Sequence, residues 1–321
     1  YERQPILNLR IKKAMKAGAR IFIVNEGATE LDRFAASKIT IPQNAAGLAA
    51  QVLLARALAS GKTTDQSNDL RARSTKEAAV ATQSFDAATV AQLEKLADEV
   101  ANAKGAVILY DEMATLAPNC ANLAADLQAL AVVTDNIERP GSGVGPLFED
   151  ANSLGARDMG LLPDALPGYQ PASEEGLAYN DMLQSADIRA LIVMGANPLR
   201  HGTLPPNLEL LVVQDITLSE TALQADVVLP AVSFAEKDGS MTNVDHHVQA
   251  VRRALRPLPG AKPDWEILGA LANHLGQKWS YRSPQDIFAE IAEHNPLYSD
   301  LTWEGLGAQG VRTREQEVVR A

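Results

Sequence analysis

Residues 190–198 read Ala-Leu-Ile-Val-Met-Gly-Ala-Asn-Pro, an apolar run that ends at a glycine and an Asn-Pro pair. Two more apolar runs follow, Leu-Leu-Val-Val at residues 210–213 and Val-Val-Leu at residues 227–229. Apolar runs of strand length, with room between them for crossover connections, are typical of parallel strands that are buried on both faces. This part of the chain is therefore expected to form a parallel sheet within an α/β domain.

The residues before this sheet also alternate between helical and strand patterns. Apolar spacing predicts helices over residues 5–17, 45–59, 86–102 and 119–130, and strands over residues 20–24, 38–41 and 106–110. Residues 61–84 are polar and carry little apolar periodicity, so a loop or an excursion is expected there. The first half of the chain is thus expected to be an α/β unit as well.

Length and punctuation predict how the chain divides into domains. A chain of 321 residues exceeds the usual size of one domain, and glycine and proline are concentrated at residues 139–180. We expect a first α/β domain over residues 1–150 and a second over residues 151–280. Residues 281–321 are expected to be a peripheral segment with a helix at residues 284–294.

Composition excludes several classes of function. The net charge of -11 argues against broad nucleic-acid binding, which relies on clustered Lys and Arg. Cys120 is the single cysteine, so this segment can hold neither a disulfide nor an iron-sulfur cluster. No apolar run approaches the roughly 20 residues of a membrane-spanning helix. The chain opens at Tyr1 on a helical pattern, as expected for a domain excised from a longer protein.

Three residues near the ends of the predicted strands are candidates for binding a nucleotide. Gly195 permits a ligand to approach the backbone closely, and the Asn197 amide can bond a phosphate or ribose oxygen. Asp215 follows the second strand, where a carboxylate can accept two hydrogen bonds from a guanine. Each has a plainer interpretation, a strand-to-loop turn for residues 195–198 and a helix cap for Asp215.

Two polar segments lie between and after these strands. Thr217-Leu-Ser-Glu220 has the spacing of a capping box and predicts a short helix. Glu236-Lys-Asp-Gly239 follows the third strand, and a solvated loop is its plainer interpretation. No catalytic residue, nucleophile or metal-ligand set is assigned, and Cys120 is expected to be a small buried residue within a helix.

Taken together, six segments resemble the nucleotide-binding half of molybdopterin oxidoreductases, in the family's order and spacing. They are residues 191–198, 213–216, 219–221, 225–230, 236–239 and 263–265. Residues 11–23 resemble the family's earlier α/β domain, and residues 152–169 resemble its inter-domain segment. The resemblance implies an α/β fold of two Rossmann-like domains with mostly parallel sheets, as in domains II and III of formate dehydrogenase and DMSO reductase-type proteins. It also implies a cofactor-binding site, vestigial if present, at Gly195, Asn197, Asp215, Thr221, Glu236 and Gly239.

The chain departs from the family at positions that would contact a cofactor. Asn25-Glu-Gly27 stands where cofactor-bearing relatives usually have Asp-Pro, so a guanine-binding carboxylate is lost. Asp111-Glu112 replaces glycines that let backbone amides approach the pterin, and two carboxylates repel a pyrophosphate. Leu147-Phe-Glu-Asp150 replaces an Arg-Gly beside the metal, and Phe148 cannot orient an oxyanion.

With these departures, the chain most closely resembles a cofactor-free version of the domain. That version is found in the large iron-sulfur subunit of bacterial NADH-quinone oxidoreductase, respiratory complex I. That resemblance implies a structural domain, not catalytic by itself, in the subunit that carries electrons from NADH toward quinone. It implies no cofactor in this segment, with iron-sulfur clusters upstream. The implied partners are other subunits of a respiratory complex, with no nucleic acid and no direct membrane span. The implied location is cytoplasmic, peripheral on the inner membrane.

Two alternatives remain from the sequence. The first is a fragment of a molybdenum or tungsten enzyme such as formate dehydrogenase, in which Gly195, Asn197 and Asp215 bind the guanine of a molybdopterin guanine dinucleotide. The second is a simple nucleotide-binding module, which would need a Gly-x-Gly-x-x-Gly sequence at the start of a helix. No such sequence is present.

Overall fold

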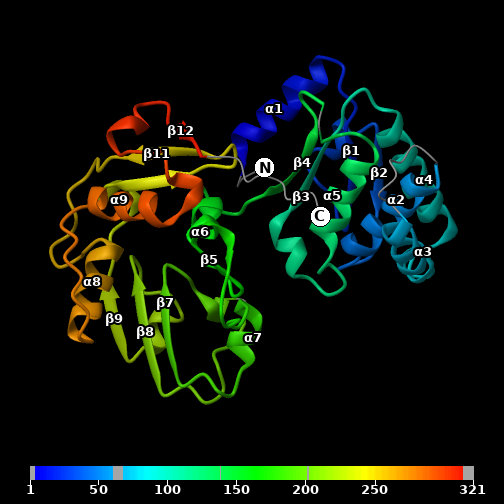
Figure 1. The fold of residues 1–321 in the computed structure, drawn as a ribbon. Helices are drawn as coiled ribbons and strands as arrows, with labels where there is room; N and C mark the ends of the chain where they lie inside the picture. The colour runs from blue at the N-terminus through cyan, green and yellow to red at the C-terminus, as the bar shows by residue number, and fades with distance from the viewer. Residues whose placement is uncertain (1–3, 61–67, 138, 201, 314–321) are drawn as a thin grey trace. The chain divides into compact units, whose positions relative to one another are not determined.

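The computed structural model describes residues 4–60, 68–137, 139–200 and 202–313 (Figure 1). The chain divides into two compact units, Tyr1–Asp150 and Ala151–Ala321. The division falls inside the stretch rich in glycine and proline at residues 139–180. Each unit mixes helices with small sheets whose strands run mostly parallel, which confirms the predicted α/β class.

The described residues of unit 1 form two separate parallel sheets. The first pairs β1 (Phe22–Asn25) with β2 (Ser37–Thr40), and the second pairs β3 (Val107–Asp111) with β4 (Gly143–Leu147). The helices are α1 (Pro5–Lys16), α2 (Ala46–Ala59), α3 (Asn68–Gln83), α4 (Ala87–Asn102) and α5 (Leu123–Val133), with 3-10 turns η1 (Asp32–Phe34) and η2 (Glu112–Leu116).

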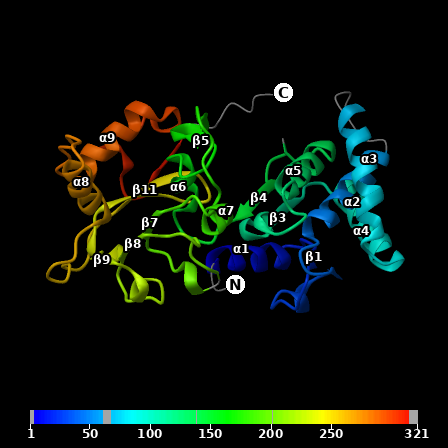
Figure 2. The ribbon, with the colours of Figure 1, turned by 90° about the horizontal axis from the view of Figure 1, so that it is seen from below.

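Helix α2 lies at the centre of the unit 1 core because it is apolar on nearly every side. Arg56 is its only charged residue, and a helix that is apolar all round has to be buried. Helices α3, α4 and α5 pack against it, and α3 and α4 are seen beside it in Figures 1 and 2. At its first turn, a Cβ on Gly47 would lie 2.1 Å from the Asn119 carbonyl oxygen. Cys120 is buried as expected, but in the loop before α5, where its Sγ accepts a hydrogen bond from the Gly47 amide at 3.3 Å.

The prediction of a loop or an excursion at residues 61–84 is wrong for most of this range, because α3 occupies Asn68–Gln83. Residues 61–67 of that prediction lie outside the described residues. Apolar periodicity fails to show the helix because small side chains form its buried face: Ala78 and Ala81 are 8% and 0% exposed. Small residues bring α3 close to α2 without the stripe of large apolar residues that marks most surface helices.

Unit 2, over its described residues 151–200 and 202–313, has one parallel and two antiparallel sheets. The parallel sheet has the order β7 (Ala190–Met194), β8 (Leu210–Asp215), β9 (Val227–Pro230). The antiparallel sheets are β10 (Gly239–Thr242), β11 (His247–Val251) and β12 (Val311–Arg312), and the pair β5 (Ala165–Leu166) and β6 (Gln170–Pro171). The helices are α6 (Ser153–Asp158), α7 (Tyr179–Gln184), α8 (Asp264–His274) and α9 (Pro284–His294).

The strands β7, β8 and β9 coincide with the three apolar runs of the sequence. Their alternate residues Leu191, Val193, Leu211 and Val213 are buried with Leu183 of α7. The first residues after β7 and β8 therefore lie at the same edge of the sheet, since the strands are parallel and adjacent.

Residues after 281, expected to be peripheral, contribute to a second buried cluster of unit 2. The cluster contains Phe288 of α9, Leu297, Tyr298, Leu301 and Leu306, together with Val248 of β11. A buried polar network joins this cluster to α6: the Asp158 carboxylate accepts hydrogen bonds from the hydroxyls of Tyr169 and Tyr298, both at 2.9 Å. This segment thus contributes several buried side chains to the core of unit 2.

The two units contain equivalent strand-turn-strand elements, β1-η1-β2 and β8-η5-β9, where η5 is Ala222–Gln224. The amide of Ala36 donates to the Ile21 carbonyl, and the amide of Asp226 donates to the Leu211 carbonyl. Likewise Ile41 donates to Asn25, and Ala231 donates to Asp215. Each residue of the first element has its counterpart 190 positions later, so Asn25 is the structural equivalent of Asp215.

Candidate functional site

The candidate site is the edge of the β7-β8-β9 sheet where the strands end. Gly195 follows β7 with φ of 59°, a conformation that favours glycine, and a Cβ there would meet no atom within 4 Å. Its amide donates to the Gln214 carbonyl of β8 at 2.9 Å. The space beside the Gly195 backbone is therefore open, as the predicted approach of a ligand requires.

Asn197 is held by a cluster of side chains from the loop after β8. Its Oδ1 accepts hydrogen bonds from the Thr221 hydroxyl at 2.8 Å and the Thr221 amide at 3.3 Å. Its Nδ2 donates to Glu220 Oε2 at 2.5 Å, and this bond holds the pKa of the Glu220 carboxyl below its ordinary value. Asn197 thus joins the loop after β7 to the loop after β8, and the second N–H of its Nδ2 is the remaining donor of the side-chain amide.

Thr221, a predicted site residue, is fully buried and completes this link between the two loops. Its hydroxyl oxygen accepts a hydrogen bond from the Leu199 amide at 3.2 Å while donating to Asn197. Glu220 is the residue of the cluster that sequence reasoning did not select. It stood inside the predicted capping box at residues 217–220, but the helical turn η5 begins only at Ala222. The Ser-Glu-Thr segment at residues 219–221 was the sequence feature that pointed to Glu220. Its hydrogen bonds to Asn197 form only in the folded chain, because the two segments are distant in sequence.

Asp215 is partly exposed at the end of β8, where it caps a turn and not the helix expected from the sequence. Its Oδ1 accepts hydrogen bonds from the amides of Ile216 at 2.6 Å and Thr217 at 3.3 Å, which stabilise the turn after the strand. Its Oδ2 has one long contact, 3.5 Å from the Ser219 hydroxyl. Oδ2 therefore keeps hydrogen-bonding capacity at the sheet edge, because a carboxylate oxygen carries two lone pairs and Oδ2 has only this one contact.

The structure does not bring Glu236 and Gly239 into this cluster. Glu236 closes a capping box in the 3-10 turn η6 (Phe234–Glu236), where its Oε2 accepts from the amide and hydroxyl of Ser233, both at 2.9 Å. These hydrogen bonds lower the pKa of the Glu236 carboxyl. Gly239 begins β10 in the antiparallel sheet. Glu236 is thus an ordered cap rather than part of a solvated loop.

A second polar cluster, not predicted from sequence, links three of the family-like segments. Asp264, in the Pro-Asp-Trp segment, accepts from Gln214 Nε2 at 2.7 Å and from Lys237 Nζ at 2.5 Å. Gln214 is 1% exposed, so its amide needs this partner. The cluster fixes α8 against β8 and against the segment after β9, and thereby supports the strand that ends in Asp215.

The equivalent edge in unit 1 has different chemistry. Asn25 takes the place of Asp215, and its Nδ2 makes a long hydrogen bond, 3.4 Å, to the Gly27 carbonyl. The neighbouring Glu26 carboxylate accepts from the Asn44 amide at 2.6 Å. An amide in place of the carboxylate, beside an acidic side chain, does not match the donor groups of a guanine.

Phe148 and Asp111, which depart from the family in the sequence, both have structural contacts within unit 1. Phe148 is 7% exposed, and its carbonyl accepts a hydrogen bond from Gln4 Nε2 at 2.6 Å. Asp111 ends β3, and its side chain accepts from the Met113 amide at 3.0 Å, which begins η2. Phe148 is thus a core residue and Asp111 a turn cap within unit 1.

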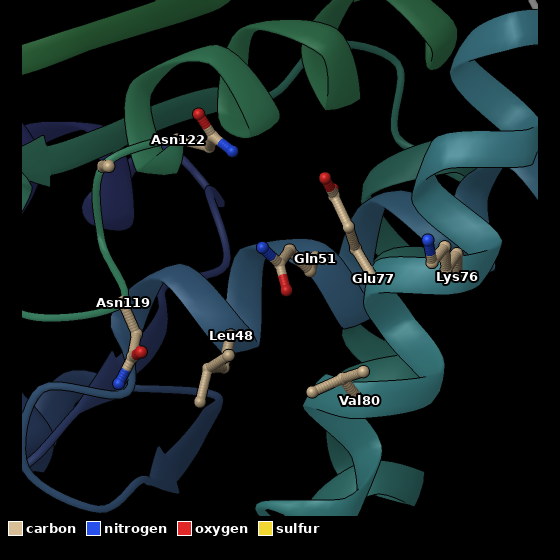
Figure 3. A pocket seen from close by; sticks show the side chains of 8 residues that line it. Leu48, Gln51, Lys76, Glu77, Val80, Asn119 and Asn122 are labelled. Carbon is tan, nitrogen blue, oxygen red and sulfur yellow. The ribbon is translucent and has the colours of Figure 1, made fainter.

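Unit 1 also contains a hollow of about 510 Å³, away from the predicted site residues (Figure 3). It lies between α2, α3 and the loop before α5, and its lining combines apolar and amide side chains. The lining residues are Leu48, Gln51, Lys76, Glu77, Val80, Asn119, Ala121 and Asn122. None of the residues selected from the sequence as ligand contacts belongs to it.

The described part of the chain offers neither a metal-ligand cluster nor a membrane-spanning helix. Among residues 4–60, 68–137, 139–200 and 202–313, no three His, Cys, Asp or Glu residues gather in a group able to hold a metal ion. Over the same ranges, every helix is too short or too polar to cross a membrane.

Comparison with known proteins supplies the family and several relatives. Residues 1–274 match the family model described as molybdopterin oxidoreductase. The F420-dependent formate dehydrogenase 1 subunit alpha of Methanococcus maripaludis is 39% identical over 211 residues, 57% of this chain and 31% of the relative. The F420-dependent formate dehydrogenase subunit alpha of Methanocaldococcus jannaschii is 38% identical over 237 residues, 65% of this chain and 35% of the relative. A putative formate dehydrogenase of Bacillus subtilis is 35% identical over 240 residues, 66% of this chain and 24% of the relative.

The chain spans about a third or less of the length of these relatives. Among solved structures, acetylene hydratase from Pelobacter acetylenicus matches with a TM-score of 0.68 and 14% identity, over 93% of this chain and 48% of that one. At this identity the match shows the shared fold alone. The relatives carry formate dehydrogenase names, so the comparisons favour the alternative interpretation over the expected resemblance to the large iron-sulfur subunit of NADH-quinone oxidoreductase.

Proposed function

Because the chain belongs to the molybdopterin oxidoreductase family, we propose that it forms the dinucleotide-binding part of a molybdenum or tungsten oxidoreductase of formate dehydrogenase type. The main support is the identity of 39% and 38% to two formate dehydrogenase alpha subunits. These relatives are longer than this chain, so the activity, the electron acceptor and the partner subunits of the whole protein belong to the proposal as well.

The edge of the β7-β8-β9 sheet is where this chain would hold the guanine end of a molybdopterin guanine dinucleotide. Asp215 would accept hydrogen bonds from the guanine ring N–H and amino group, chiefly through Oδ2, which has only a long contact at present. Gly195 leaves space for the ligand next to the backbone. Asn197, Glu220 and Thr221 would hold the two loops in place without touching the guanine.

When bound, the cofactor supplies a metal ion that takes up electrons from the substrate. The residues described here would bind and orient the nucleotide end of that cofactor. The Asp215 carboxylate is a hydrogen-bond acceptor that would fit one guanine, at unit 2. The equivalent edge of unit 1 would not fit a second guanine, because Asn25 replaces the carboxylate there.

The same asymmetry favours a second candidate function, a cofactor-free structural domain of NADH-quinone oxidoreductase. Phe148 is buried where related enzymes carry an Arg-Gly beside the metal, and Asp111 caps a turn where they carry glycine. A chain that only supports neighbouring subunits needs none of the groups that unit 1 lacks. This candidate predicts that neither metal nor guanine accompanies the protein.

Metal and nucleotide analysis of the native protein, purified without oxygen, tests the proposal. We expect molybdenum or tungsten together with guanine nucleotide released on denaturation. Asp215→Asn keeps an acceptor at Oδ1 but places an amide donor against the guanine, and guanine content is expected to fall about tenfold. Asn25→Ala, at the equivalent position of unit 1, is the matched control and should leave guanine content unchanged. A native protein with neither metal nor guanine would support the structural domain instead.

A further inference from the structure

We propose that an ordered surface of unit 2, the arginine patch, binds an acidic protein segment that carries aliphatic side chains. The arginine patch consists of Phe234, Arg252, Arg253, Leu255, Arg256 and Leu258. Phe234 belongs to η6, and the other five residues lie in the loop that leads from β11 to α8, yellow to gold in Figure 1. The proposal concerns a contact with another polypeptide and goes beyond the cofactor function.

The arginine patch is held in shape by backbone hydrogen bonds. The amides of Ala254 and Leu255 both donate to the Ala235 carbonyl at 2.9 Å. The amide of Arg253 donates to Asp238 Oδ1 at 3.0 Å. The loop is thus fastened along η6 and the residues that follow it, which places the Leu255 backbone beside Ala235, the residue after Phe234. A surface ordered before binding loses little conformational entropy when a partner docks.

Three large apolar side chains of the patch face solvent. Phe234 is 73% exposed, Leu255 is 61% exposed and Leu258 is 72% exposed. Single exposed apolar residues are normal, but neighbouring ones on an ordered loop are the composition of a contact surface. An unpartnered loop would be expected to carry polar residues at these positions.

The charge of the patch specifies the partner. Arg252, Arg253 and Arg256 are exposed, and within the described residues none of them makes a side-chain ion pair. Residues 252–262 contain no Asp or Glu, in a chain whose net charge is -11. The neighbouring acids are engaged: Glu236 caps η6, and Asp238 accepts the Arg253 amide. Three unpaired guanidinium groups beside apolar side chains complement carboxylates and aliphatic groups on a partner.

A protein partner suits the patch better than an anionic membrane. Membrane-binding basic segments use about 4–8 Lys or Arg residues or an amphipathic helix, whereas this patch has three arginines on an irregular loop. Arginine together with an aromatic side chain is the combination enriched at protein interfaces, because guanidinium groups bind carboxylates in a planar, paired geometry.

Fluorescence anisotropy with a labelled peptide rich in Glu and Leu, and the whole chain as its receptor, tests the proposal. Two variants test the charged and the apolar residues of the patch separately. The first changes all three arginines, through Arg252→Gln, Arg253→Gln and Arg256→Gln, and the second changes two of the three apolar residues, through Phe234→Ser and Leu258→Ser. The matched control changes the same amount of charge elsewhere, through Lys13→Gln, Lys16→Gln and Lys104→Gln, three exposed lysines of unit 1. We expect each patch variant to weaken peptide binding about tenfold and the control variant to bind as the wild type does.

Several outcomes would overturn the proposal. The proposal would be wrong if the peptide failed to bind at millimolar concentration, or if the control variant lost as much affinity as the arginine variant. It would also be wrong if a peptide in which Ser replaces Leu bound as tightly as the original. Binding would then depend on non-specific charge alone and not on the apolar side chains of the patch. If phosphatidylserine vesicles bound the patch and displaced the peptide, the surface would be a membrane-binding site instead. Circular dichroism of every variant separates loss of the surface from loss of the fold.

Discussion

Replacing Tyr298 with Phe should destabilise unit 2 and leave unit 1 intact. The Tyr298 side chain is 2% exposed, and its hydroxyl lies 2.9 Å from Asp158 Oδ2 and 2.6 Å from the Thr242 hydroxyl. The variant deprives a carboxylate that is 1% exposed of one of its two tyrosine donors. Loss of a buried hydrogen bond to a charged group costs about 2 kcal/mol, and we expect the free energy of unfolding of unit 2 to fall by that amount.

Tryptophan fluorescence during urea unfolding measures this change in unit 2 alone. The three tryptophans, Trp265, Trp279 and Trp303, all belong to unit 2. Tyr281→Phe is the matched control, because it removes a hydrogen bond to Glu290 on the surface and should cost less than about 0.5 kcal/mol. Equal losses in the two variants, or no loss in Tyr298→Phe, would refute the argument that the buried carboxylate depends on Tyr298.

The same network predicts how stability depends on pH. Burial, reinforced by the charge of Asp158, raises the pKa of Tyr298 above its ordinary value of 10.0. A pKa that is higher in the folded state than in the unfolded state contributes stability that is complete below pH 10 and is lost as pH rises toward the folded value. The free energy of unfolding should therefore decline above pH 10 less steeply in Tyr298→Phe than in the wild type. A parallel decline in the two proteins would contradict this.

Three other predictions concern single positions. Gly47→Ala should lower the stability of unit 1 by about 3 kcal/mol, because its Cβ would lie 2.1 Å from the Asn119 carbonyl oxygen. Gly27→Ala is the control, because a Cβ at that position would meet no atom within 4 Å, and its stability should be unchanged. Thermal unfolding followed by circular dichroism measures both variants. The hydrogen bond from Lys38 lowers the pKa of Asp32 to about 2, so a carboxyl NMR titration should find its midpoint there, and Lys38→Met should move it toward 3.8. The stabilisation from this pair should persist above pH 3.8 and disappear as pH falls toward 2; an unchanged midpoint in the variant would contradict the pairing. Asn197→Ala should raise the pKa of Glu220 toward 4.5 in the same experiment, because Asn197 is the main donor to that carboxylate.

The sequence by itself determined the strands of the unit 2 sheet and the class of fold. The runs at residues 190–194, 210–213 and 227–229 are apolar enough to be read as parallel strands, and each became one. Their order along the chain also placed Gly195 and Asp215 at one sheet edge, since parallel strands end together. Helix α3 was missed because its buried face is made of alanines such as Ala78 and Ala81, which carry no periodic signal.

Only the tertiary structure decided what the polar residues do. That Asn197 joins the loop after β7 to the loop after β8 depends on Glu220 and Thr221, which lie more than 20 positions away in the chain and 2.5–2.8 Å away in space. Asp264 is a neighbour of Gln214 only because α8 packs on β8. Local pattern reports the apolar face of an element, because burial repeats with the period of the backbone; hydrogen bonds between loops follow no period, so they become visible only when the chain has folded.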